Sequence, residues 1–243
     1  MKPKNTSHEF ALYVDDLVVH SNDVVIPHKD VLHRMVHVLR LQEGDVFVVF
    51  NDQYVFRVVL TTASKKEATC HIQEKIQVIK PMPVITALVP VLKKEALEDA
   101  VYAAVELGVT RIVLTQTARN HHAVLTPSFM QRLKAIMHAA QEQAKQFFPV
   151  IIEGPVVLEE ALAACKSSAV KIAALQGGGP LKEYFAKKPV SVAVIVGPES
   201  DFSEEEKELL STYGFVGCSL GSTVLRAQQA LTVLIGSVRS LTA

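Results

Sequence analysis

Three glycine-containing turns stand out in the second half of the chain, because each one directly follows an apolar run. They are "LQGGGP" (Leu175–Pro180), "VGPES" (Val196–Ser200) and "SLGS" (Ser219–Ser222). Glycine lets the backbone approach a ligand closely, so exposed N–H and C=O groups can recognise it. In an open α/β sheet, ligands bind at the carboxyl ends of the strands, where such turns lie. One such turn alone is more often a plain connection, but three in succession indicate a binding site built from backbone groups.

The turns lack the spacing of the common nucleotide-binding motifs. The sequence contains no G-x-x-x-x-G-K-[ST], which excludes a P-loop. No G-x-G-x-x-G opens a helix after the first buried strand, which argues against a standard dinucleotide site. The run Gly177–Gly179 is short and ends at Pro180. We therefore expect a ligand that is not held through phosphates.

An acidic helix is predicted directly after the second turn. Ser203 and Glu206 have the spacing of a capping box, in which each side chain binds the backbone N–H of the other residue. Glu204 and Glu205 place negative charge in the first turn, where the helix dipole favours it. Helix capping accounts for all three glutamates, so we assign none of them to catalysis.

Composition narrows the class of protein. The 243 residues are 49% hydrophobic and 21% charged, which is typical of one large globular domain or two modest ones. The 25 Lys and Arg residues balance the 25 Asp and Glu residues, which counts mildly against a nucleic-acid partner without excluding a local basic patch. Cys70, Cys165 and Cys218 are odd in number and far apart, which indicates neither a disulfide framework nor a zinc site.

Neither a membrane segment nor a signal peptide is predicted. No window of the sequence is apolar for long enough to cross a membrane. The first eight residues, "MKPKNTSH", lack the apolar core of a signal peptide. We expect a cytoplasmic protein.

The first eighty residues are predicted to form a small β-barrel with one helix. Apolar residues at helical spacing precede a stop at Gly44; they are Val31, Leu32, Met35, Val38 and Leu39. Strands are predicted at Asp45–Asn51, Tyr54–Leu60 and Ala68–Val78, the first two joined by a hairpin turn. The segment "KPMP" (Lys80–Pro83) is a predicted linker, which gives domains at 1–80 and 81–243.

The second domain alternates strands with helices, which predicts a parallel sheet covered on both faces. The predicted strands are Val84–Pro90, Arg111–Thr117, Val170–Leu175 and Val190–Gly197. The predicted helices are Lys93–Val109, Pro127–Phe147 and Ala227–Leu241.

Two segments carry a resemblance to a known family. "IVGPESDFSEEE" and "SLGSTVLRAQQALTVL" resemble the two signature motifs of the bacterial 16S ribosomal RNA (uridine-N3) methyltransferases, which belong to the SPOUT class of S-adenosylmethionine-dependent enzymes. "HRMVHVLRLQEGDVFVVFN" is similar to the PUA-like segment of that family, and "LEDAVYAAVELGVTRIVL" is similar to the start of its catalytic domain. The resemblance covers nearly the whole chain.

The resemblance implies a fold, a cofactor and partners. The fold is a PUA-like RNA-binding β-barrel followed by an α/β SPOUT domain whose parallel sheet carries a deep trefoil knot. The cofactor is S-adenosylmethionine, bent within the knot and held by backbone groups of three loops that match the three turns. The implied cofactor-binding residues are Leu175, Gln176, Gly177, Val196, Gly197, Pro198, Glu199, Ser219, Leu220, Gly221 and Leu225.

The implied partners are 16S ribosomal RNA in the small ribosomal subunit and a second copy of the chain. The family forms homodimers through the helices of its knot. Four apolar residues of the last helix either serve that interface or belong to the core of one chain; they are Leu231, Val233, Leu234 and Ile235.

The chain departs from the family pattern at several positions. Ser200 and Asp201 replace two glycines of the usual Gly-Pro-Glu-Gly-Gly-Phe turn, which adds a charge. Thr223 replaces an arginine, and Gln228 replaces a glutamate. Ala118-Arg119 stands where the family has Glu-Arg, and Glu142-Gln143 is followed by Ala-Lys-Gln instead of Ser-Gly-Arg.

The implied reaction is attack of uridine N3 on the methyl group of the cofactor. N3 is weakly acidic, so a cation near O2 or O4 of the base favours the reactive anion. Arg226 is the candidate for this catalytic role, and the alternative is an arginine at a helix start that pairs with an acid or a phosphate. With Gln228 in place of glutamate, the sequence offers no clear general base.

Four cations are candidates for RNA binding. Arg34 and Arg40 fall with His37 along one face of the predicted N-terminal helix, where a merely solvated face is the alternative. Arg119 and Lys145 are the other two, and Arg119 is assigned to the RNA backbone more than to chemistry. The pair His121-His122 lacks a third ligand at suitable spacing, so we expect a loop and no metal.

The altered signature leaves two further functions open. One is a degenerate member of the family that binds ribosomal RNA without methylating it. The other is a methyltransferase with a different RNA target.

Overall fold

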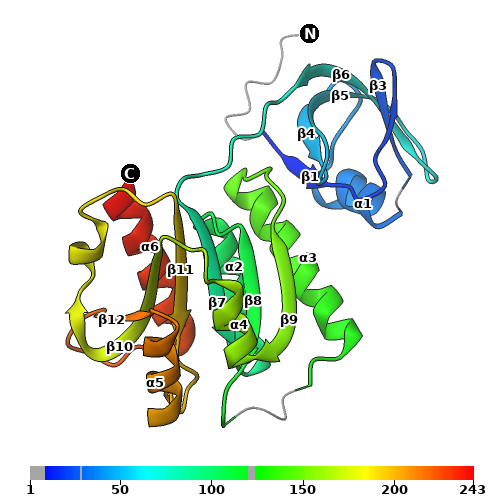
Figure 1. Ribbon diagram of the computed structural model, residues 1–243. Coiled ribbons are helices and arrows are strands. Elements are labelled where there is room, and N and C mark those ends of the chain that lie inside the picture. The colour runs from blue at the N-terminus through cyan, green and yellow to red at the C-terminus, as the bar shows by residue number, and fades with distance from the viewer. Residues whose placement is uncertain (1–8, 28, 120–123) are drawn as a thin grey trace. The chain divides into compact units, whose positions relative to one another are not determined.

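The computed structural model describes residues 9–27, 29–119 and 124–243 (Figure 1). The opening segment "MKPKNTSH" and the pair His121-His122 lie outside the described residues. The chain divides into two compact units. The N-terminal unit extends to Ile79 and also includes Gln141–Pro149, whereas the second unit comprises Lys80–Ala140 and Val150–Ala243.

A curled six-stranded sheet forms the N-terminal unit (Figure 1). Its strands lie in the order β1 (Ala11–Tyr13), β4 (Val46–Phe50), β5 (Val55–Ala63), β6 (Ala68–Lys75), β3 (Asp23–Ile26) and β2 (Val18–His20). Within the β4–β5 hairpin, the Asn51 side-chain oxygen accepts the N–H groups of Gln53 and Tyr54 at 2.9 and 2.8 Å. Fully buried Leu12, Met35 and Phe47 lie in the core. The small barrel with one helical segment is confirmed.

The helical segment of this unit differs from the prediction. An α-helical turn, α1 (Lys29–His33), continues as a π-helical turn, η1 (Arg34–Val38). Arg40 lies beyond the helix, with a left-handed φ of 54°. The prediction that Arg34 and Arg40 share one α-helical face was therefore wrong, because the wider turn changes the residue spacing and the helix ends before Arg40.

A six-stranded parallel sheet forms the centre of the second unit, as predicted. Its strands lie in the order β12 (Val216–Ser219), β10 (Val170–Pro180), β11 (Ser191–Val196), β7 (Val84–Pro90), β8 (Arg111–Gln116) and β9 (Ile151–Val157). The helices are α2 (Lys94–Glu106), α3 (Pro127–Ala144), α4 (Leu158–Ala164), α5 (Glu204–Thr212) and α6 (Ala227–Thr242), with a short 3-10 helix η2 (Leu181–Phe185). The two edge strands, β9 and β12, were not predicted.

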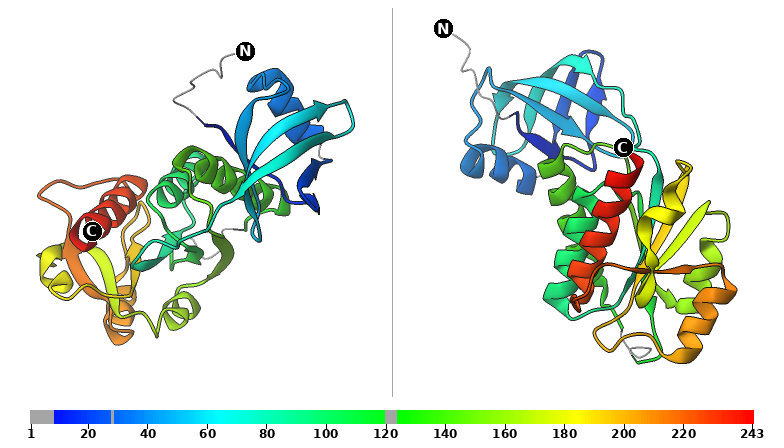
Figure 2. Two further views of the ribbon diagram at one scale, coloured as in Figure 1. Left: turned by 90° about the horizontal axis from the view of Figure 1, so that it is seen from above. Right: turned by 90° about the vertical axis from the view of Figure 1, so that its left-hand side faces the viewer.

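Helices cover both faces of this sheet. α4 and α5 pack against buried Leu88, Val113 and Ile195, which point to one face. α2 and α6 lie side by side on the opposite face (Figures 1 and 2). Parallel strands buried on both faces are expected to be continuously apolar, and β11 reads Ser-Val-Ala-Val-Ile-Val.

The apolar residues of α6 are divided between core and surface. Leu231, Leu234 and Ile235 are at most 1% exposed within a single chain, whereas Val233 is 40% exposed. The first three therefore belong to the intrachain core, which was one of the two alternatives. Of these four, Val233 is left on the surface.

Candidate functional site

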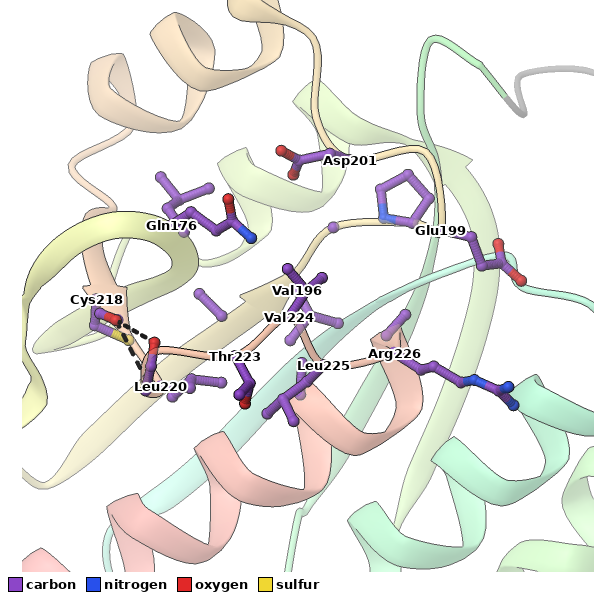
Figure 3. A pocket seen from close by; sticks show the side chains of 18 residues that line it. Gln176, Val196, Glu199, Asp201, Cys218, Leu220, Thr223, Val224, Leu225 and Arg226 are labelled. Carbon is purple, nitrogen blue, oxygen red and sulfur yellow. Dashed lines mark hydrogen bonds between the residues drawn. The ribbon is translucent and has the colours of Figure 1, made fainter.

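A pocket of about 380 Å3 lies where the three glycine-containing turns meet (Figure 3). All the residues predicted to bind a cofactor line this pocket, with the exception of Gly177. Arg226 also lines it. Sequence reasoning did not assign Ala174, Cys218, Val224, Ala227 or Ala230 to the site, although these also line the pocket.

Strand β10 explains why Gly177 is not part of the pocket lining. The strand was predicted to end at Leu175, but it continues to Pro180 with an excursion from its pairing with β12. Ala174 and Gly179 both lie opposite Cys218, so the four residues between them leave the ladder. Leu175 and Gln176 at the start of the excursion line the pocket, whereas Gly177 takes a left-handed φ of 75°.

Gly178 allows the excursion to pack directly on β12. A Cβ atom at this position would lie 2.6 Å from the backbone nitrogen of Cys218 and 2.6 Å from the carbonyl carbon of Gly217. No side chain fits at such distances. Part of the "GGG" pattern therefore serves the contact between two strands and not a ligand.

The second turn is closed by local hydrogen bonds. The N–H of Asp201 donates to the carbonyl of Pro198 at 3.0 Å. Asp201 has a left-handed φ of 62°, a region that glycine adopts freely and that aspartate tolerates better than most residues. Its Oδ1 accepts the N–H of Phe202 at 2.8 Å. Aspartate thus fits where the resembling family has glycine.

The predicted capping box of α5 is confirmed. Ser203 Oγ accepts the N–H of Glu206 at 3.2 Å, and Glu206 Oε2 accepts the N–H of Ser203 at 2.8 Å. Glu206 has a second partner that the sequence did not indicate. Its Oε1 accepts the N–H of Ala118, in the turn after β8, at 2.7 Å. The carboxylate is buried, so these N–H groups replace its contacts with water.

Charged side chains stand at the rim of the pocket. Glu199, Asp201 and Arg226 line it and are exposed. Figure 3 shows the Arg226 side chain extending away from those of Gln176 and Leu220. Arg226 is the N-cap residue of α6, and within the described part of the chain its guanidinium has no hydrogen-bond or ion-pair partner. It is therefore available to an anionic group outside the pocket.

Cys218 contributes a neutral surface to the pocket. Its side chain is fully buried, and burial raises the pKa of the thiol to about 11. A thiol with this pKa is protonated near neutral pH, whereas the thiolate is the nucleophilic form. Cys218 is therefore a packing residue and not a nucleophile.

Two of the cations predicted to bind RNA have partners within their own unit. Arg34 donates to both carboxylate oxygens of Glu142, at 3.1 and 2.6 Å, and the same carboxylate accepts the N–H of Tyr13 at 2.9 Å. Arg119 donates to the carbonyl oxygen of Ser200. The Arg34–Glu142 pair accounts for the glutamate at position 142, because a buried carboxylate needs such neutralisation.

The other two candidates lie on exposed backbone outside regular helix. Arg40 and Lys145 are both exposed and both have a left-handed φ, of 54° and 56°. Partial burial lowers the pKa of Lys145, and Glu142 opposes that shift. Their geometry leaves both ammonium and guanidinium groups accessible to solvent.

The described residues form neither a cluster of metal-ligating side chains nor a membrane-spanning helix. No group of three or more His, Cys, Asp or Glu side chains in residues 9–27, 29–119 and 124–243 is arranged to hold a metal ion. Over the same ranges, no helix combines the length and the apolar character needed to span a bilayer.

Family comparison identifies both units. Residues 80–239 match the family described as RNA methyltransferase domain. This chain belongs to the RNA methyltransferase family. Residues 30–73 match a second family, described as RNA methyltransferase PUA domain. The expected membership and the expected PUA-like N-terminal unit are both confirmed.

Relatives of this RNA methyltransferase chain match it along nearly its full length. A protein of Rickettsia conorii named ribosomal RNA small subunit methyltransferase E is 25% identical over 236 residues, which cover 95% of each chain. The structure of the protein of the same name from Neisseria gonorrhoeae, bound to S-adenosylmethionine, has a TM-score of 0.86 at 22% identity and covers 96% of this chain and 98% of its own.

A third comparison gives the same fold. A methyltransferase of Legionella pneumophila, solved in complex with S-adenosylmethionine, has a TM-score of 0.85 at 24% identity, with 96% of this chain and 98% of the other covered. At this level of identity the two structures establish the fold of the RNA methyltransferase chain, which is the predicted α/β domain preceded by the PUA-like unit.

Proposed function

We propose that the protein transfers a methyl group from S-adenosylmethionine to N3 of a uridine in 16S ribosomal RNA of the small subunit. The observation that carries the proposal is the pocket itself. Three backbone turns converge at the carboxyl ends of parallel strands in a chain of the RNA methyltransferase family. Relatives across nearly the full length carry the name ribosomal RNA small subunit methyltransferase E.

The pocket suits the proposed cofactor in size and in chemistry. Its volume of about 380 Å3 lies in the range of small-molecule sites. Leu220, Leu225 and Ala230 give it apolar surface, and Glu199 and Asp201 place carboxylates at its rim. S-adenosylmethionine combines apolar and aromatic groups with a cationic sulfonium and an ammonium group, which carboxylates attract.

In this mechanism the protein binds and orients, and the cofactor supplies the reactive methyl group. Backbone groups of Gly197–Glu199 and Ser219–Gly221, which line the pocket, would hold the cofactor. The Arg226 guanidinium at the rim, which has no partner among the described residues, would bind the uracil carbonyl oxygens and stabilise the N3 anion that forms when the N3 proton passes to water. Holding both reactants in line accounts for a large share of the acceleration.

The PUA-like unit would bind the ribosomal RNA, with exposed Arg40 and Lys145 as phosphate contacts. A homodimer would form through the exposed part of α6, which includes Val233, since the other apolar residues of this helix are buried within the chain. The trefoil knot, the domain boundary near Lys80 and the cytoplasmic location remain predictions.

The deciding experiment is methyl transfer from radiolabelled S-adenosylmethionine to small subunits from a strain that lacks the modification. Nuclease digestion and mass spectrometry then locate the methyl group. We expect the methyl group at uridine N3. We expect turnover by Arg226→Ala to be at least about 100-fold slower, because a charge-stabilising contact in the transition state is lost. Arg132→Ala is the matched control, since Arg132 is an exposed arginine that pairs with Glu98 outside the pocket.

Each outcome separates the alternatives. A methyl group on another atom or another RNA would overturn the proposed target and favour a methyltransferase of different specificity. Absence of transfer by a folded protein that binds the subunit would favour the non-catalytic alternative, and would point to Thr223 and Gln228. An unchanged rate in Arg226→Ala would remove Arg226 from the mechanism.

A further inference from the structure

We propose that Arg119 is a positioning residue of the pocket, which orients the turn that binds the cofactor, and is not a contact for the RNA backbone. The proposal rests on the proposed function, because it takes the pocket as the cofactor site. Its basis is a pair of contacts between the segment after β8 and the turn at Gly197–Ser203.

The first contact is at the centre of the turn. Arg119 Nη1 donates to the carbonyl oxygen of Ser200, which stands between Glu199 and Asp201. Both of these neighbours line the pocket. A hydrogen bond to the Ser200 carbonyl fixes the plane of the peptide that joins Ser200 to Asp201, and hence the direction of the groups on either side.

The second contact is at the end of the same turn. The N–H of Ala118 donates to Glu206 Oε1 at 2.7 Å, and the N–H of Ser203 donates to Oε2 of the same carboxylate at 2.8 Å. Two consecutive residues, Ala118 and Arg119, therefore reach both the middle and the end of the turn. The buried carboxylate of Glu206 makes this a fixed anchor and not a surface contact.

The backbone of the turn needs this support. Asp201 takes a left-handed φ of 62°, which is unfavourable for a residue with a Cβ atom. Such a conformation persists when the surrounding contacts enforce it. The hydrogen bonds from Asp201 N–H to Pro198 and from Phe202 N–H to Asp201 are local, and Arg119 adds a tie to a different part of the chain.

An exposed arginine such as Arg119 could bind RNA phosphate or could position the Ser200 carbonyl, and these two roles can be told apart by measurement. A guanidinium that contacts phosphate acts on the affinity for RNA and on its salt dependence. A guanidinium that holds the Ser200 carbonyl acts on the affinity for the cofactor, with RNA affinity unchanged once the cofactor is saturating. The two roles therefore predict changes in different quantities: the affinity for RNA in the first, and the affinity for the cofactor in the second.

The experiment measures binding of S-adenosylhomocysteine by calorimetry, together with KM for small subunits at saturating S-adenosylmethionine. For Arg119→Ala we expect the Kd for S-adenosylhomocysteine to rise about tenfold, as a charge-assisted hydrogen bond is lost, and KM for subunits to stay within twofold. Arg119→Lys retains a donor for the carbonyl, and we expect it to recover at least half of the lost affinity on a logarithmic scale. Arg132→Ala is expected to match the unsubstituted protein.

The outcomes that would overturn the proposal are distinct. An unchanged Kd with a raised subunit KM and a weaker salt dependence would assign Arg119 to RNA. A lowered melting temperature with an unchanged Kd at 20 °C would make Arg119 merely a stabilising residue. If the unsubstituted protein failed to bind S-adenosylhomocysteine, the proposed function itself would fail, and that result is visible before any variant is tested.

Discussion

Two of the segments that line the pocket are held in place by different kinds of contact. We call Gly197–Ser203 the first wall and Ser219–Arg226 the second wall. The wall at Gly197–Ser203 is tied to the segment after β8. Arg119 binds the carbonyl of Ser200, and the Glu206 carboxylate accepts the N–H groups of both Ser203 and Ala118. The wall at Ser219–Arg226 has only short-range side-chain hydrogen bonds within the described residues, namely those between Ser219 Oγ and the backbone of Gly221. Its anchors are strand β12 at one end and helix α6 at the other.

The difference matches what each wall has to do in the proposed reaction. Backbone groups that hold a cofactor must be preorganised, so side-chain braces suit the first wall. The second wall carries Arg226 toward the RNA, and its Val224 is 80% exposed. Segments with few buried contacts are the ones that open and close at low cost. The comparison indicates a rigid first wall opposite a second wall whose end at Val224 and Arg226 is more adaptable.

The largest effect is expected from Gly178→Ala, which disrupts the packing of the β10 excursion on strand β12, the strand that anchors the second wall. The added Cβ would lie 2.6 Å from the backbone of Cys218, so the β10 excursion must move off β12. We expect the free energy of unfolding to fall by about 2–3 kcal/mol, measured by urea denaturation. Gly177→Ala is the matched control, because its Cβ meets no atom within 4 Å and only the left-handed φ opposes it. Equal losses in the two variants would contradict the anchor.

An intermediate effect is expected from raising the pH, again at the second wall. Burial raises the pKa of the Cys218 thiol from its ordinary value of 9.0, which applies in the unfolded chain, to about 11. The folded state therefore binds a proton that the unfolded state loses, so stability is complete below the lower value and declines as the pH rises toward the higher one.

The test compares unfolding free energies at pH 7.5 and pH 10 for the unsubstituted protein and Cys218→Ala. We expect the substitution to reduce the alkaline loss of stability by about 1–2 kcal/mol. Cys70 and Cys165, whose thiol pKa values are also raised by burial, are present in both proteins and cancel in the comparison. Identical losses would show that β12 does not bury Cys218 in solution.

The smallest effect is expected from Asp201→Gly in the first wall. Glycine relieves the left-handed strain, but it removes the hydrogen bond that Asp201 Oδ1 accepts from Phe202 and adds chain entropy to the unfolded state. These terms oppose each other, so we expect a change of less than about 1 kcal/mol in stability, measured as a shift in thermal midpoint. A loss of several degrees would mean that the Asp201 side chain, and not the Arg119 and Glu206 braces, holds this wall.

The sequence predicted those parts of the two walls whose partners are neighbours in the chain. The Ser203–Glu206 capping box was predictable because both residues lie within one helical turn. Strand β7 was predicted to the residue because Val84–Pro90 is apolar at every position except Thr86. The three turns were found for the same reason, since each is marked by local glycines after an apolar segment.

The remaining features depend on partners that are remote in sequence. The bond from Ala118 to Glu206 joins residues 88 positions apart, and the bond from Arg34 to Glu142 joins residues 108 apart, so no local pattern indicates either one. The role of Gly178 in strand packing was not predicted, because its contact, strand β12, is a segment of only four residues that the sequence pattern did not reveal. Strand β9 was missed because Gly154 and Pro155 interrupt its pattern.

The Glu206 carboxylate, which binds both Ala118 and Ser203, affects when the pocket can fold during synthesis of the chain. It joins the turn after β8 to the start of α5, and translation separates those segments by 88 residues. β7 and β8 leave the ribosome early and lie inside the sheet, whereas β12, which borders the pocket, is the last strand made. Chains fold from the N-terminus as they are synthesised. The pocket thus cannot assemble on a nascent chain until α5, β12 and the start of α6 have emerged. A protein truncated before Val216 would retain five neighbouring strands of the sheet without a complete site.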